Sequence, residues 1–115
     1  NGKPSGSVMA VDFELNGSLF SALNGGQIPG FNFTPATSFM IRCQNQEEID
    51  RYWAALSAVP EAEQCGWCTD KFGITWQVVP EILNELMSDP QKAERATKAF
   101  LPMKKFDLAT LLEAV

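Results

Sequence analysis

The stretch Gln64–Pro80, QCGWCTDKFGITWQVVP, decides the fold of this chain, because it contains a turn, a two-sided strand and two of the three tryptophans. Side chains alternate between the two faces of a strand, so Ile74, Trp76 and Val78 share one face. The opposite face holds Thr75, Gln77 and Val79. The apolar face predicts contact with a core, and the other face predicts a polar environment.

The composition indicates one globular domain spanning residues 1–115, with 45% apolar and 20% charged residues. The net charge of −5 and the pI near 4.6 argue against nucleic acids and anionic membranes as partners, because both require clustered positive charge. The sequence shows no secretory leader, and its three cysteines are odd in number, so we expect reduced thiols and a cytoplasmic protein. The first residues, NGKPSGS, predict a flexible segment.

Two strands and a tight turn are predicted near the start of the chain. Val8–Leu15 alternates strictly between apolar and other residues, as a half-buried strand does. Asn16-Gly17 then tolerates the positive φ angles of a type I′ turn. Ser18–Leu23 is therefore expected to return antiparallel to the first strand.

The middle and end of the chain predict a third strand followed by helices. Ala36–Cys43 alternates as a strand, and Asn45 with Glu48 resembles a capping box that begins a helix over residues 46–58. Asp70 to Gly73 is expected to form the turn between two further strands. Beyond Pro80 the apolar period becomes helical, and Asp89 and Asp107 are predicted N-caps.

Several segments together resemble one family: ALNGG (Ala22–Gly26), FTPATSFMIRC (Phe33–Cys43), QEEIDRYW (Gln46–Trp53) and the stretch quoted first. They are similar to the PhnB-like branch of the vicinal oxygen chelate superfamily, relatives of glyoxalase and bleomycin-resistance proteins that are often labelled demethylubiquinone methyltransferase. The ending MKKFDLATLLEA (Met103–Ala114) also resembles that family. The resemblance implies an α+β fold of βαβββ type, with a curved mixed sheet and C-terminal helices.

The resemblance also implies a modular plan within a single glyoxalase-like domain. Residues 8–23 would be the hairpin of a first module, residues 36–79 a second module and residues 80–115 a helical tail. Family members carry a strand-helix-strand before this hairpin that the sequence does not show. Because the sheet then lacks the strands that close a cup, and because open sheet edges promote aggregation, we expect a homodimer.

The sequence lacks the residues expected for a metal site and for a methyl-donor site. The superfamily holds its metal with histidine and glutamate, but the matching positions are Ser21, Ala36 and Gln77, and the sequence contains no histidine. A methyl-donor nucleotide usually requires a glycine-rich turn between a strand and a helix, whereas Gly25-Gly26 precedes a loop. We therefore expect no metal and no cofactor.

The cup face implied by the resemblance is lined by polar side chains. Its candidate ligand-binding residues are Ser21, Asn24, Ser38, Arg42, Trp67, Thr75 and Gln77. An arginine among serine, glutamine and asparagine suits a small anionic or carbonyl-bearing molecule. Alternatively, these side chains simply face solvent on an open sheet.

Cys65 and Cys68 form a CxxC motif and are a candidate redox pair, although the residues that follow predict a turn and a strand rather than the helix that acidifies such thiols. Three functions therefore stay open. The first is a metal-independent small-molecule-binding protein, and the second is a metal-dependent lyase or dioxygenase-type enzyme whose ligands lie outside this chain. The third is a thiol redox protein.

Overall fold

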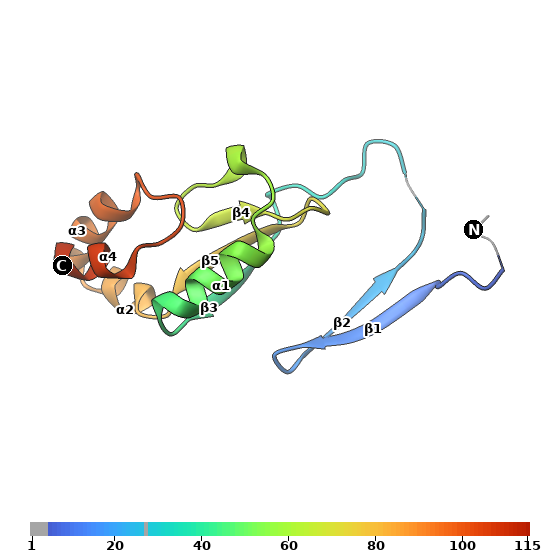
Figure 1. Cartoon of the computed structure of the whole chain (residues 1–115), viewed down its shortest axis with the longest axis horizontal. Helices are drawn as coiled ribbons and strands as arrows, with labels where there is room; N and C mark the ends of the chain where they lie inside the picture. Colours follow the sequence, from blue (N-terminus) through green and yellow to red (C-terminus); the bar gives the residue numbers. More distant parts are fainter. Residues whose placement is uncertain (1–4, 27) are drawn as a thin grey trace. The chain divides into compact units, whose positions relative to one another are not determined.

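The structure, a computed structural model, describes residues 5–26 and 28–115, and the first four residues of the expected flexible start lie outside them (Figure 1). The elements are β1 (Ala10–Leu15), β2 (Ser18–Leu23), β3 (Ser38–Cys43), α1 (Gln46–Leu56), a 3₁₀ turn (Pro60–Ala62), β4 (Trp67–Thr69), β5 (Thr75–Pro80), α2 (Leu83–Ser88), α3 (Pro90–Phe100) and α4 (Leu108–Ala114). This order confirms the predicted succession of strands and helices. The fold is mixed α+β, with a two-stranded and a three-stranded sheet.

The chain divides into two compact units, a hairpin unit of residues 1–32 and a main unit of residues 33–115. In the hairpin unit, β1 pairs antiparallel with β2, as predicted. Asn16 and Gly17 have φ angles of 47° and 86°, the positive values that a type I′ turn requires. Phe13 faces Phe20 across the strands, and their rings stack with centroids 5.5 Å apart.

The main unit contains a mixed sheet in the order β3-β5-β4. The central strand β5 runs parallel to β3 and antiparallel to β4. Parallel neighbours require a crossover connection, and α1 lies on that connection (Figure 1). Phe39, Ile41, Trp76 and Val78 share one sheet face by register.

Helix α1 packs against the apolar face of this sheet. Ile49 is fully buried, and Tyr52, Trp53 and Leu56 pack against the same core as Ile41, Trp76 and Val78. The predicted core face is therefore confirmed for Trp76 and Val78, whereas Ile74 precedes the strand, which begins at Thr75. The predicted cap is confirmed as well, since Asn45 Oδ1 accepts from the backbone N–H of Glu48 at 2.9 Å. The helix ends at Leu56, earlier than predicted, where the N–H of Ser57 bonds to the carbonyl of Trp53.

Three C-terminal helices, α2, α3 and α4, gather at one end of the main unit (Figure 1). The predicted N-caps are confirmed, because Asp89 accepts from the N–H groups of Gln91 and Lys92, and Asp107 accepts from that of Thr110. These helices complete the core with Leu86, Ala96 and Leu111. Among the residues described, no helix combines the length and apolar composition that crossing a membrane requires.

Candidate functional site

The predicted ligand-binding residues fall in both units. Ser21 and Asn24 belong to the hairpin unit, where their side chains bond within the hairpin. Ser21 Oγ donates to Asp12 Oδ1 on the facing strand, and Asn24 Nδ2 donates to the carbonyl oxygen of Val8 at 3.1 Å. Both polar groups therefore contribute to holding β1 and β2 together.

The remaining candidates lie on one face of the main-unit sheet, opposite α1. The register places Ser38 of β3 beside Thr75 of β5. Gln77 of β5 lies between Met40 of β3 and Trp67 of β4. Gln77 Nε2 donates to Ser38 Oγ at 3.0 Å. The structure thus brings Ser38, Gln77 and Trp67 together across three neighbouring strands, and on β3 Met40 lies between Ser38 and Arg42.

Along the central strand β5, this face is buried at both ends and more accessible in the middle. Thr75 is only 4% exposed and Val79 only 7% exposed, whereas Gln77 between them is half-buried. Arg42 is exposed near the end of β3, and none of the ion pairs found in residues 5–26 and 28–115 involves it. The accessible part of this face, called the open face below, consists of Ser38, Met40, Arg42, Trp67 and Gln77.

Ala36 lies outside β3, which corrects the predicted start of that strand. The strand begins at Ser38, because residues 34–37 form a turn in which the N–H of Thr37 bonds to the carbonyl of Thr34 at 3.3 Å. The side chain of Thr34 also accepts from the N–H of Ala36 at 3.2 Å. Pro35 and the Thr34 hydroxyl favour a turn over an extended strand at this point.

A hollow of about 320 Å³ lies beside β4 and is lined by Ala62, Gln64, Cys65 and Trp67. Sequence reasoning missed it, because it depends on the 3₁₀ turn Pro60–Ala62 lying against β4. The sequence of residues 60–63 predicts a loop but does not indicate that this loop packs against β4. Trp67 therefore belongs both to the open face and to the wall of this hollow.

The CxxC cysteines are both free thiols in different surroundings. Cys68 is buried on the apolar sheet face opposite Trp76, and burial, with the nearby charges of Glu63 and Asp70, raises its pKa to about 11. Cys65 is half-buried, and its Sγ donates to the carbonyl oxygen of Leu101 at 3.2 Å. A reactive thiol pair needs a lowered pKa, so the environment of Cys68 is opposite to that of a redox dithiol.

The residues present do not fit a divalent metal ion or a nucleotide methyl donor. Positions 21, 36 and 77 offer a hydroxyl, a methyl and an amide, and no cluster of three His, Cys, Asp or Glu side chains forms within the described part of the chain. The turn between β3 and α1, Gln44-Asn45, contains no glycine. Its helix N-terminus is capped by Asn45, and the Glu48 carboxylate accepts from Gln44 N at 2.8 Å, so a negative charge already lies beside this turn and disfavours a phosphate there.

Comparison with known proteins identifies the family. No curated protein matches the chain. A family model described as 3-demethylubiquinone-9 3-methyltransferase matches residues 1–79, which include β1 to β4, α1 and all but the last residue of β5, while α2, α3 and α4 lie beyond the match. The chain therefore belongs to the 3-demethylubiquinone-9 3-methyltransferase family, a family of the glyoxalase and bleomycin-resistance type.

Proposed function

We propose that this protein binds a small anionic or carbonyl-bearing molecule on the open face, without a metal or other cofactor. The observation that carries the proposal is the hydrogen bond between Gln77 and Ser38 on the sheet face that also presents Arg42. It orients the Gln77 amide, which lies between Trp67 on β4 and Met40 on β3, and Arg42 follows Met40 by two residues on the same face of β3. Binding sites commonly combine apolar walls with a few oriented polar groups in this way.

The chemistry of these side chains selects the ligand class. The guanidinium of Arg42 can donate two parallel hydrogen bonds to a carboxylate, a geometry that lysine cannot reproduce. The bond to Ser38 uses one N–H of the Gln77 amide, and an amide has a second N–H donor and a carbonyl acceptor for a ligand. The Trp67 indole and the Met40 thioether supply apolar contact. A small carboxylate or 2-oxo acid matches this set of groups.

The donor set supports metal independence, since none of the side chains at positions 21, 36 and 77 binds a divalent ion tightly. A metal-dependent lyase or dioxygenase would need ligands from outside this chain. The thiol redox alternative is disfavoured by the raised pKa of Cys68.

The proposal includes self-association and the modular plan of the family. Residues 8–23 would correspond to the end of a first module, residues 36–79 to a second and residues 80–115 to a helical tail. In the described sheet, β3 is an edge strand, and the hairpin unit exposes apolar side chains, so a homodimer would protect both. A cytoplasmic location fits the three free cysteines.

A thermal-shift screen of the full chain against 2-oxo acids, dicarboxylates and phosphate monoesters tests the proposal. A bound compound stabilises the folded state by mass action, by about 2.7 kcal/mol at one hundred times its Kd. Arg42→Ala should abolish the shift, and Arg95→Ala, at an exposed position of α3, should retain it. Either the absence of any shift at millimolar ligand or an equal shift in Arg42→Ala would contradict the proposal.

A further inference from the structure

The segment between α3 and α4, residues 101–107, runs beside the turn that leads into β4 and is called the C-terminal strap. The N–H of Cys65 donates to the carbonyl of Met103 at 2.8 Å, and the N–H of Gly66 donates to the carbonyl of Lys104 at 2.7 Å. The Cys65 thiol adds its bond to the carbonyl of Leu101. Consecutive backbone bonds therefore join the strap to the Cys65–Trp67 turn.

The contact is close because Gly66 has no side chain. Its φ angle is +84°, and a Cβ at this position would lie 2.6 Å from Phe106 Cε2 and 2.9 Å from the Val78 carbonyl oxygen. Both distances are shorter than real Cβ contacts allow. The ring of Phe106, which is 1% exposed, therefore rests directly on the backbone of the turn.

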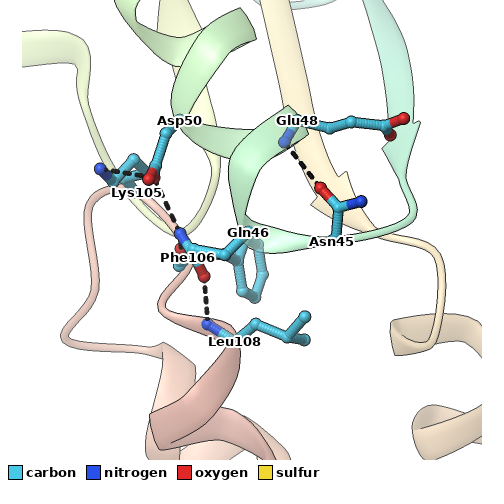
Figure 2. Close-up of polar contacts among 7 residues, drawn as sticks. All are labelled: Asn45, Gln46, Glu48, Asp50, Lys105, Phe106 and Leu108. Atoms are coloured by element: carbon cyan, nitrogen blue, oxygen red, sulfur yellow. Dashed lines mark hydrogen bonds and ion pairs between the residues drawn. The ribbon is translucent and has the colours of Figure 1, made fainter.

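The strap is tied on its other side to the first turn of α1 (Figure 2). Gln46 Nε2 donates to the Phe106 carbonyl at 2.9 Å, and Gln46 Oε1 accepts from the N–H of Leu108 at 2.7 Å. Lys105 Nζ lies 2.8 Å from Asp50 Oδ1. One glutamine side chain thus binds the backbone on both sides of Asp107 and fixes the strap in place.

We propose that the C-terminal strap is a positioning element for the open face. The strap holds the Cys65–Trp67 turn, and the Gly66 carbonyl accepts from the N–H of Val78 at 2.8 Å, which couples the turn to β5. Trp67 lies opposite Gln77, so the place of its indole on the open face depends on the strap. The strap belongs to the part of the chain beyond the family match.

The ligand-related part of this inference rests on the proposed function, but its test requires no ligand. Gln46→Leu in the full chain removes both amide bonds to the strap. Amide hydrogen exchange followed by NMR should show Cys65 and Gly66 exchanging about tenfold faster, because one or two lost bonds favour local opening by this factor. Gln46→Glu keeps the acceptor for Leu108 but places a carboxylate against the Phe106 carbonyl and Asp50 Oδ1, both of which accept from Gln46 Nε2 at 2.9 Å in the wild type, so it should also raise exchange. Gln91→Leu, on the exposed start of α3, is the matched control and should leave exchange unchanged.

Fluorine NMR of protein labelled with 5-fluorotryptophan reports the indole directly. Gln46→Leu should shift the resonance of Trp67 and leave those of Trp53 and Trp76 in place. The inference fails if Cys65 and Gly66 keep wild-type exchange in the folded variant, or if exchange rises equally along β3, which would indicate global destabilisation. If these NMR measurements give the expected results but the thermal-shift screen finds no ligand, the inference about the strap stands. Only the proposed function is then overturned.

Discussion

Asp70 and Trp76 join the turn between β4 and β5 to the core, because the Asp70 carboxylate accepts a hydrogen bond of 2.9 Å from the Trp76 indole Nε1. The other carboxylate oxygen accepts from the N–H groups of Phe72 at 2.8 Å and Ile74 at 3.0 Å. The Trp76 ring in turn contacts Phe39, with centroids 5.4 Å apart. A single buried carboxylate thus closes the turn and orients an aromatic side chain that packs against the core.

Replacing this carboxylate should destabilise the protein. Asp70→Asn keeps the size of the side chain but removes the charge and places an N–H donor or a weaker acceptor near the Trp76 indole. Hydrogen bonds to charged groups contribute about 1.5–3 kcal/mol, so we expect a loss in this range in the free energy of unfolding. Chemical denaturation measures it, with Glu113→Gln on the exposed side of α4 as the control. Equal stability of Asp70→Asn and wild type would refute this role.

The same carboxylate predicts a pH dependence of stability. Burial acts to raise the pKa of Asp70, but the bonds from Trp76, Ile74, Phe72 and Gly73 outweigh it and hold the pKa below its ordinary value of 3.8. The folded protein therefore binds this proton more weakly than the unfolded chain does. The stabilisation is present above pH 3.8 and is lost as the pH falls through the lower folded value.

Unfolding by denaturant between pH 7 and pH 3 measures this effect. Wild type should lose stability more steeply than Asp70→Asn as the solution becomes acidic. Asp50 also has a lowered pKa, caused first by its bond to Lys105, but it is exposed and its effect should be screened by salt. Parallel pH profiles for wild type and Asp70→Asn would show that Asp70 does not titrate as inferred.

The cysteines should differ in reactivity in the native state. Burial raises the pKa of Cys43 and of Cys68 to about 11, so at pH 8 only about one in a thousand of these thiols is ionised. A disulfide-based thiol reagent should therefore modify Cys65 first. Cys65→Ser should remove the early phase, and Cys68→Ser should leave it. Rapid oxidation of the native protein to a Cys65–Cys68 disulfide by glutathione disulfide would instead support the redox alternative.

Local signals in the sequence predicted much of the fold. The capping residues Asn45, Asp89 and Asp107 all accept the expected backbone bonds, because a cap is decided within a few residues. The Asn16-Gly17 turn and the apolar face of β5 were predictable for the same reason. Periodicity reports only which side of an element is buried, and this sufficed for Trp76 and Val78 on β5.

The features that depend on distant contacts were not predictable. The alternation of β5 does not reveal that its parallel neighbour is β3. The residues around Gly66 likewise do not indicate that the ring of Phe106 packs against its backbone. The polarity of Thr75 predicted accessibility, yet the residue is buried. Each of these outcomes is decided by a partner far away in the sequence, which composition and periodicity do not identify.

Self-association should depend on the hairpin unit. One face of the hairpin is apolar: Val11 is 47% exposed and Leu15 is 46% exposed, and they lie on either side of the stacked rings of Phe13 and Phe20. Apolar side chains exposed in this way often mark a protein interface, and a two-stranded hairpin is only marginally stable on its own. Sedimentation velocity at micromolar concentration should show a species of twice the chain mass of 12.7 kDa.

A lysine in the hairpin should weaken this association, because burying its charge in an interface requires desolvation without a partner. Leu15→Lys should shift the equilibrium toward monomer by at least tenfold in Kd, which corresponds to about 1.4 kcal/mol. Leu112→Lys, at a position of α4 that is 45% exposed, tests whether any added charge has the same effect and should leave the dimer intact. If wild type sediments only as monomer, or if Leu15→Lys dimerises as well as wild type, the hairpin does not form the interface.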